Sequence, residues 1–290
     1  MRSLLAPPRR RCAHPPLALA LAFALPLLAF ACERAPEGGA LQPAGAAATA
    51  NEGDSPPTPE PTLGADGLHE IAGIHYREYI SGGAEAEAEL PMVIAIHGLG
   101  DSPEDFEGLF RGFDRPARVI VPRGLEAHGP GWSWFPIRTA GADPEALAAG
   151  IRAAADALAP AITALSKARP TAGKPIVTGF SQGGMLSFAL AVEHGELISA
   201  AYPMGGALPE PLWPKPGSAP AAAPPILAFH GEADTRVPLA PTQRAVEALT
   251  AAGYAVELRT YPGLEHSINR PMHTELMATV RTQLAALTAP

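Results

Sequence analysis

The stretch Ile176–Gly184, which reads IVTGFSQGG, decides the fold of this chain. Three β-branched residues run into a G-x-S-x-G pattern, and apolar residues at helical spacing follow over Met185–Val192. This order predicts a buried strand, a sharp turn and a helix, the context in which the pattern presents a serine hydroxyl. A serine on so sharp a turn is strained, and the flanking glycines leave room for it. We therefore predict that Ser181 is a nucleophile; the alternative is a glycine-rich turn that merely starts a helix.

Apolar runs on both sides of this stretch predict further strands of the same sheet. The runs at Met92–Ile96, Val119–Val121 and Ile226–Phe229 are continuously hydrophobic, which suits strands that are buried on both faces of a parallel sheet. Residues Ile74–Ile80 alternate instead, as expected for an outer, half-exposed strand. Val256–Tyr261 is also strand-like.

Helical patterns separate these strands. One begins at Asp143-Pro144, a cap residue followed by proline at the first helical position, and continues through Leu158. Another runs over Pro241–Ala252 and stops at a glycine, and a last one covers about Pro271–Leu287. Strands that alternate with helices predict an α/β fold with a mostly parallel central sheet and helices on both of its faces.

A serine hydroxyl is a weak nucleophile until a base takes its proton, and the base needs an acid to fix its tautomer. In α/β-hydrolases the chain order is serine, then aspartate or glutamate, then histidine. Downstream of Ser181 the acids at a strand end are Glu232 and Asp234, and the histidines are His266 and His273. We predict Asp234 and His266, since His273 falls inside the last helical pattern, where a surface histidine is the simpler interpretation.

Three histidines follow strands and raise the possibility of a metal site. They are His97, His230 and His266, but no H-E-x-x-H pattern accompanies them, so we predict no metal ligand and no cofactor. We expect His97 and His230 to hydrogen-bond the loops around the cleft. Trp132 and Trp134 lie in a loop rich in Pro and Gly, where substrate contact and core packing are both open.

The chain resembles the phospholipase/carboxylesterase family of α/β-hydrolases, which includes the acyl-protein thioesterase-like esterases. The resemblance rests on blocks whose order covers nearly all of residues 90 to 270. The blocks are HGLGDS at 97–102, SWF at 133–135, GFSQGG at 179–184, GEADTRVP at 231–238 and HS at 266–267.

The resemblance implies an α/β-hydrolase fold without a large cap domain. It also implies that the amides of Leu99 and Gln182 form an oxyanion hole, and that the segment with Trp134 and Phe135 lines the acyl side of the cleft. The function it implies is that of a serine esterase for carboxylic esters, with lysophospholipids and thioesters as candidate substrates. A peptidase of the prolyl-oligopeptidase type, or a catalytically silent α/β-hydrolase that binds a lipid or a protein, are the alternatives.

Composition excludes several other functions. The chain has 290 residues, of which 17% are charged, and its net charge of −8 argues against a nucleic-acid partner, which would need a clustered basic face. The two cysteines are Cys12 and Cys32. A disulfide framework, a cysteine-ligated zinc and a cysteine nucleophile are therefore excluded from the body of the chain.

The first 31 residues have the pattern of an export signal. Arg9–Arg11 precede the apolar run Leu17–Ala31, which ends in Ala29-Phe30-Ala31 directly before Cys32. We predict a signal peptide at 1–31, of the lipoprotein type, with a lipid on Cys32 as the membrane contact. A free secreted or periplasmic protein and an uncleaved anchor are the alternatives. All three place the body outside the cytoplasm, facing the periplasm or the exterior.

Two segments are predicted to lie outside the packed core. Residues 32–66 are rich in Ala, Pro and Gly and have few side chains to bury, so we predict a disordered linker before a catalytic domain at 67–290. Residues 211–225 read PLWPKPGSAPAAAPP and are interpreted as a surface loop, which could shield the cleft with Trp213 as a contact.

Overall fold

The computed structural model describes residues 59–136 and 143–289. The predicted signal peptide, Cys32 and all of the predicted linker before residue 59 lie outside the described residues. The blocks that carry the family resemblance, from His97 to Ser267, all lie inside them.

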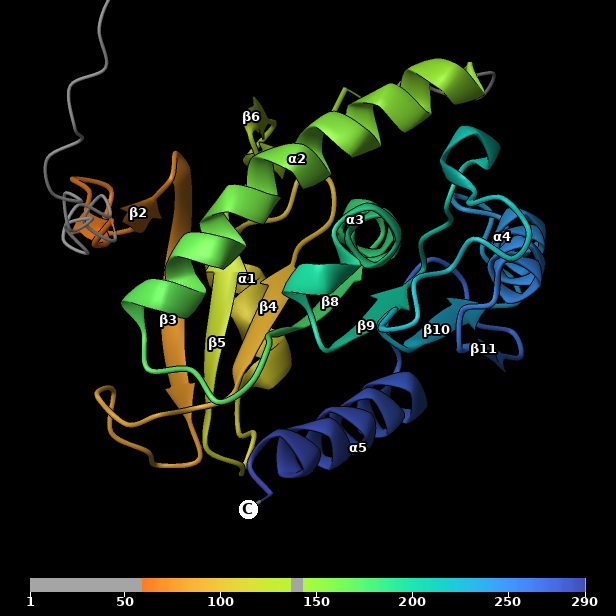
Figure 1. Cartoon of the computed structure of the whole chain (residues 1–290). Helices are drawn as coiled ribbons and strands as arrows, with labels where there is room; N and C mark the ends of the chain where they lie inside the picture. Colours follow the sequence, from red (N-terminus) through yellow and green to blue (C-terminus); the bar gives the residue numbers. More distant parts are fainter. Residues whose placement is uncertain (1–58, 137–142, 290) are drawn as a thin grey trace, which may run out of the picture. The chain divides into compact units, whose positions relative to one another are not determined.

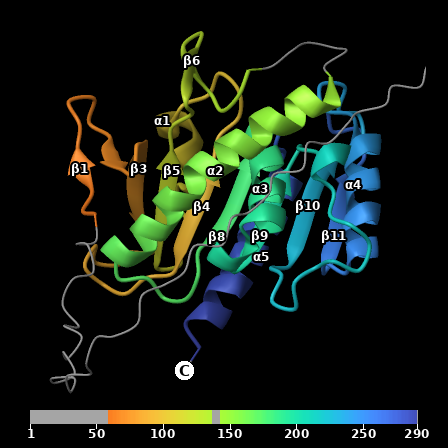
Figure 2. The ribbon, with the colours of Figure 1, turned by 45° about the horizontal axis from the view of Figure 1, so that its top comes forward.

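A nine-stranded sheet organises the described residues (Figures 1 and 2). Its strands, in spatial order, are β1 (Thr62–Leu63), β2 (His69–Ile71), β3 (Ile74–Ser81), β5 (Ala117–Pro122), β4 (Met92–Ile96), β8 (Ile176–Phe180), β9 (Ala200–Met204), β10 (Ile226–Gly231) and β11 (Val256–Tyr261). From β5 to β11 all neighbours are parallel, whereas β1, β2 and β3 pair antiparallel. The predicted, mostly parallel sheet is confirmed.

Burial explains why the sequence marked these strands so clearly. Every residue of β4 and β5 is buried, which is the reason for their continuous hydrophobicity. Strand β3, predicted as an outer strand, is more exposed, but it still has β2 and β1 beyond it.

Strand formation occurs within the range that was predicted to be a disordered linker. Strand β1 lies inside the range 32–66 that was predicted as a disordered linker, because Thr62 and Leu63 pair with β2. Nearby, Asp66 accepts a hydrogen bond from the Leu68 N–H at 3.1 Å and forms an ion pair with Arg123 at 2.8 Å. The boundary after residue 66 is therefore corrected to a position before β1.

Helices cover both faces of the sheet, as Figure 1 shows for α2, α3 and α5. They are α1 (Pro103–Phe106), α2 (Pro144–Ala168), α3 (Gln182–Glu193), α4 (Leu239–Ala252) and α5 (Arg270–Leu287). The buried side chains of α2, α3 and α4 belong to one apolar cluster, and those of α1 and α5 belong to another. The two clusters are the two layers of core, with the sheet between them.

The predicted ends of two helices are confirmed. The Asp143 side chain caps α2 by accepting from the Glu145 N–H at 3.2 Å, and α4 ends at Gly253, which has a φ of 101°. Helix α2 is also long and apolar enough to cross a membrane by length and composition, yet it packs on the sheet, which accounts for its apolar residues.

A small hairpin, which the sequence did not reveal, follows β5. Strands β6 (Glu126–His128) and β7 (Gly131–Ser133) pair antiparallel and form a separate two-stranded sheet. The backbone of β7 returns to the main fold, since the Trp132 N–H donates to the Asp101 carbonyl at 3.0 Å. The hairpin therefore delivers the following residues to the carboxyl ends of the parallel strands, where ligands of such sheets bind.

Candidate active site

The turn between β8 and α3 holds Ser181 in a strained backbone conformation. Its φ of 58° and ψ of −113° lie where residues other than glycine are rarely found. The turn closes because two neighbours have no side chain. A Cβ on Gly179 would lie 2.6 Å from the Ile96 carbonyl oxygen, and one on Gly183 would overlap the same oxygen. The two glycines therefore let the end of β4 pass close to the turn, which places the serine at the carboxyl end of β8.

The residues predicted as catalytic form one hydrogen-bonded chain. The Oγ of Ser181 lies 2.9 Å from Nε2 of His266, and Nδ1 of His266 lies 2.6 Å from Oδ2 of Asp234. Because a carboxylate oxygen can only accept, Nδ1 carries the proton, and Nε2 is free to accept from the serine hydroxyl. The ring of Phe180 packs against the His266 ring, with 4.7 Å between centroids.

A tight turn after β10 holds the Asp234 carboxylate. Its Oδ1 accepts from the backbone N–H groups of Arg236 and Val237, both at 2.9 Å, which leaves Oδ2 for His266. The Asp234 side chain is 1% exposed, against 10% for His266. The acid is thus held by the backbone of its own turn, and the imidazole it orients is the more accessible of the two.

The alternative acid and base lie elsewhere. Oε1 of Glu232 accepts from the Thr260 hydroxyl at 2.8 Å, and this pair is exposed. Nε2 of His273, on α5, donates to the Leu109 carbonyl at 2.8 Å. The fold brings neither side chain to the serine.

The peptide groups predicted to form an oxyanion hole flank Ser181. A Cβ on Gly98 would lie 3.3 Å from Cβ of Ser181, so the segment that continues into Leu99 passes directly beside the serine. Gln182 is the first residue of α3, where a backbone N–H has no acceptor inside the helix. Within the described residues the Leu99 N–H also donates to no backbone carbonyl.

The side chain of Gln182 hydrogen-bonds the backbone of Trp134 and Phe135, the segment that was predicted to contact the acyl group. It is buried, accepts from the Trp134 N–H at 3.0 Å and donates to the Phe135 carbonyl at 2.9 Å. The Trp134 indole N–H donates to the His97 carbonyl at 3.0 Å. Trp134 and Phe135 are each 2% exposed, so they pack in the core in this structure, and their contact with a substrate stays a prediction.

His97 and His230 hydrogen-bond the surrounding loops, and this prediction is confirmed. Nδ1 of His97 donates to the Gly98 carbonyl at 2.7 Å, and its Nε2 accepts from the Gly124 N–H at 3.0 Å. Nε2 of His230 donates to the Val237 carbonyl at 2.8 Å. Burial lowers the pKa of both histidines, which favours the neutral imidazole.

Metal-ligating side chains do not cluster in the described part of the chain. No group of three or more His, Cys, Asp or Glu residues there could hold a metal ion. His97, His230 and His266, considered above as ligands, instead bond to the peptide groups and the carboxylate already named.

An apolar pocket of about 340 Å³ adjoins the hydrogen-bonded chain, and the sequence patterns predicted little of it. The Met185 N–H donates to the Ser181 carbonyl at 3.0 Å, and Val237 belongs to the turn that holds Asp234. Further apolar lining comes from Leu147, Leu208, Trp213 and Pro238. The signals in the sequence were Trp213 of the 211–225 loop and the block GEADTRVP, which contains Val237 and Pro238.

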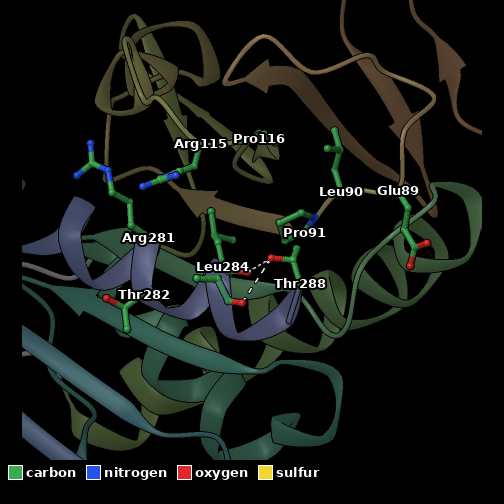
Figure 3. A pocket seen from close by; sticks show the side chains of 10 residues that line it. Glu89, Leu90, Pro91, Arg115, Pro116, Arg281, Thr282, Leu284 and Thr288 are labelled. Atoms are coloured by element: carbon green, nitrogen blue, oxygen red, sulfur yellow. Dashed lines mark hydrogen bonds between the residues drawn. The ribbon is translucent and has the colours of Figure 1, made fainter. Parts of the chain in front are cut away.

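A second cavity, of about 670 Å³, lies at the opposite edge of the sheet (Figure 3). Leu90 and Pro91, which precede β4, line it together with residues near the end of α5, such as Leu284. Arg281 at its rim pairs with Asp114 at 2.8 Å. No histidine or cysteine lines this cavity.

A parallel sheet with a strained serine after a central strand, and with an imidazole and a carboxylate supplied by later loops, defines an α/β-hydrolase. Residues 80–286 match the model of the Phospholipase/Carboxylesterase family, and the chain belongs to that family. Its enzyme class is therefore that of a carboxylic ester hydrolase.

Individual relatives agree with the family. The chain is 26% identical over 225 residues to acyl-protein thioesterase 1 of Gibberella zeae. This match covers 69% of this chain and 93% of that protein. It is 34% identical over 165 residues to the protein NocK of Nocardia uniformis subsp. tsuyamanensis. This match covers 55% of this chain and 44% of NocK. The chain thus spans less than half the length of NocK. The crystal structure of esterase PE8 matches with a TM-score of 0.62 and 23% identity, over 72% of this chain and 98% of PE8, and shows the shared fold.

Proposed function

We propose that the chain hydrolyses carboxylic esters through an acyl-enzyme, with Ser181 as nucleophile, His266 as general base and Asp234 as the orienting acid. The carrying observation is the hydrogen-bonded chain, with 2.9 Å between serine and histidine and 2.6 Å between histidine and aspartate. Both distances are in the range that proton transfer and tautomer control require.

In the first half-reaction the Ser181 oxygen attacks the ester carbonyl carbon while Nε2 of His266 takes the hydroxyl proton. The carbon–oxygen bond to the leaving alcohol then breaks, and the imidazolium returns the same proton to that alcohol. The acyl group remains on the serine. Asp234 stays ionised throughout and stabilises the imidazolium.

In the second half-reaction a water molecule replaces the alcohol. The water oxygen attacks the acyl carbon while Nε2 of His266 takes a proton from the water. The imidazolium then gives that proton to the serine oxygen as the carboxylic acid product leaves. A thioester would give the same acyl-enzyme, because only the leaving atom, sulfur in place of oxygen, differs. The chemistry therefore includes both oxygen esters and thioesters.

The negative charge of each tetrahedral intermediate is proposed to be held by the N–H groups of Leu99 and Gln182. Both peptide groups adjoin the serine, from the loop after β4 and from the start of α3. Each such donor contributes about 10²- to 10³-fold to kcat in known acyl-transfer enzymes.

The apolar pocket of about 340 Å³ is proposed to bind the acyl chain. Met185 and Val237, which line it, are held next to the serine and next to the aspartate. Each buried methylene contributes about 0.8 kcal/mol, or up to about fourfold in kcat/KM. With p-nitrophenyl esters of increasing acyl length, kcat/KM is expected to rise until the pocket is filled and then level off.

Labelling with a fluorophosphonate tests the function directly. The activated hydroxyl displaces fluoride and forms a bond to phosphorus, so one label is expected on the full chain, at Ser181 by peptide mapping. Ser181→Ala removes the label, while the control Ser166→Ala on α2 retains it. Labelling at another residue, or none at all, together with p-nitrophenyl ester hydrolysis no faster than background, would contradict the proposal and favour a silent binding protein.

We further propose that the chain is exported and anchored by a lipid on Cys32. The support is the basic, apolar and small-residue order that precedes this cysteine. In a bacterial host, metabolic labelling with a fatty acid is expected to mark the wild type but not Cys32→Ser. Equal labelling of both would contradict the anchor.

A further inference from the structure

Positive charge gathers at the rim of the acyl pocket. Arg236 and Arg244 both line the pocket, and both side chains are exposed. Neither lies within 4.0 Å of a carboxylate oxygen among the described residues, although the net charge of the chain is −8. In so acidic a chain, two guanidinium groups without a carboxylate partner at one pocket are available to a ligand.

The start of helix α4 adds to this charge. Pro238 is its N-cap and lines the pocket, no side chain caps the helix, and its first turn contains no acidic residue. The free N–H groups of a helix start carry a partial positive charge. Among the lining residues Glu210 alone carries an opposing charge, so the rim is positive on balance.

The rim is held in a fixed relation to the reacting groups. The Arg236 N–H donates to Oδ1 of Asp234 at 2.9 Å, so the turn that holds the acid also places this arginine. Helix α4, which carries Arg244, is tied to the turn after β9, because the Thr242 hydroxyl donates to the Gly206 carbonyl at 2.9 Å. Both arginines at this pocket therefore stand on backbone that is anchored near the reacting groups.

We infer that this pocket selects acyl groups that combine an apolar chain with an anionic end, in the first place a carboxylate. The inference rests on the proposed function, since it assigns the acyl group of that reaction. The apolar lining takes the methylenes, and the guanidinium groups of Arg236 and Arg244 bind the terminal carboxylate, whose two oxygens match the guanidinium fork.

The test compares two esters that differ only at the end of the acyl chain, p-nitrophenyl hydrogen adipate and p-nitrophenyl hexanoate. The readout is the ratio of their kcat/KM values for the full chain. We expect this ratio to fall about three- to fivefold in Arg236→Gln and in Arg244→Gln, and about tenfold in the double variant, as for exposed charge pairs. The ratio should also fall as salt is raised, because salt screens these charges.

A matched control removes an arginine elsewhere. Arg111 is exposed and follows the short helix η1 (Glu107–Phe110), whose buried Phe110 belongs to the other core layer. Arg111→Gln changes the net charge equally and is expected to leave both kcat/KM values unchanged. An unaltered ratio in the double variant, with hexanoate still hydrolysed, would overturn the inference and leave the esterase proposal standing.

Binding without turnover separates the two proposals further. Hexanesulfonate has an apolar chain and an anionic end but no ester, and its Kd is measured by calorimetry. About tenfold weaker binding to the double variant than to the wild type supports the charged pocket even if neither ester is hydrolysed, an outcome that would contradict only the proposed function. Equal binding by both proteins would overturn the inference.

Discussion

Two carboxylates of this protein, one buried and one largely buried, have different kinds of partner. The side chain of Asp234 is 1% exposed and bonds to His266, whereas that of Glu78 is 10% exposed and pairs with Arg118 and Arg169. An imidazole gains and loses a proton near neutral pH, but a guanidinium does not. The first pair can therefore take part in proton transfer, and the second can only hold structure.

The position of each pair in the fold follows the same division. Glu78 lies on β3, Arg118 lies on β5, and Arg169 directly follows α2, so the cluster ties two strands to a helix end. Arg118 also donates to the Ala86 carbonyl at 2.6 Å. At the carboxyl edge, by contrast, the imidazole reaches a half-buried serine. A buried charge thus indicates a reactive site only when its partner can exchange a proton and a substrate can reach it.

The largest effect is expected for the serine. Ser181→Ala should lower kcat for a p-nitrophenyl ester by about 10⁶-fold, because without the nucleophile the imidazole and the aspartate have nothing to activate. The urea midpoint should stay close to that of the wild type, since alanine keeps the same strained backbone. Ser166→Ala, which removes a hydroxyl bonded to the Ile162 carbonyl on α2, is the control. A Ser181→Ala protein within tenfold of wild-type kcat would contradict the role.

The second largest loss of kcat is expected for Asp234. Asp234→Asn should lower kcat by about 10⁴-fold, because an amide can hold the imidazole in the wrong tautomer and cannot stabilise the imidazolium. Glu232→Gln, two residues earlier, should leave kcat unchanged, since that carboxylate bonds to Thr260. Equal losses in the two variants would show that Asp234 has no special role.

Replacement of Glu78 should lower stability and leave catalysis nearly unchanged, the reverse of what is expected for Ser181 and Asp234. Glu78→Gln is expected to lower the free energy of unfolding by about 3–5 kcal/mol, because Arg118 is left buried without its main counter-charge. The kcat of the folded protein should stay within about twofold of the wild type. Urea unfolding measures the first quantity and initial rates the second.

Two further variants keep this prediction testable if Glu78→Gln folds poorly. Glu104→Gln removes an exposed partner of Arg77 and should cost less than about 1 kcal/mol. The double variant Glu78→Leu/Arg118→Met removes both buried charges and should recover most of the lost stability. A double variant as unstable as Glu78→Gln would argue against the buried charge as the cause.

The smallest effect is a dependence of stability on pH. Burial raises the pKa of Glu78, but the hydrogen bonds and charges of Arg169 and Arg118 outweigh it and hold the pKa below its usual range. Since the folded pKa is the lower one, the stabilisation is complete above the unfolded pKa of about 4.3 and is lost as pH falls through the folded value. The difference in urea midpoint between wild type and Glu78→Gln should therefore shrink at acid pH. A difference in urea midpoint that stays constant from about pH 7 to about pH 3 would contradict the predicted dependence of stability on the ionisation of Glu78.

Local patterns predicted the reactive turn well, and left open the features that depend on packing between distant segments. Gly179 and Gly183, two residues from Ser181, mark the turn in the sequence, although the Ile96 carbonyl that leaves them no room for a side chain lies on β4. The loop pattern around Trp134 left core packing and substrate contact both open, and only the packing shows that Trp134 and Phe135 are buried, with Gln182 bonding their backbone from α3. The order in β1 was missed for the same reason, since its partners lie on β2.

The sequence alone therefore determined the alternation of strands and helices, the position of the serine and, through chain order, the choice of Asp234 and His266. These depend on neighbours or on a fixed order along the chain. Only the tertiary structure decided which loops surround the pocket of about 340 Å³, which arginines line it, and that Glu78 pairs with Arg118 and Arg169. Such properties depend on contacts between residues far apart in the chain, 91 positions in the case of Glu78 and Arg169, and the order of the strands in the sheet sets those contacts.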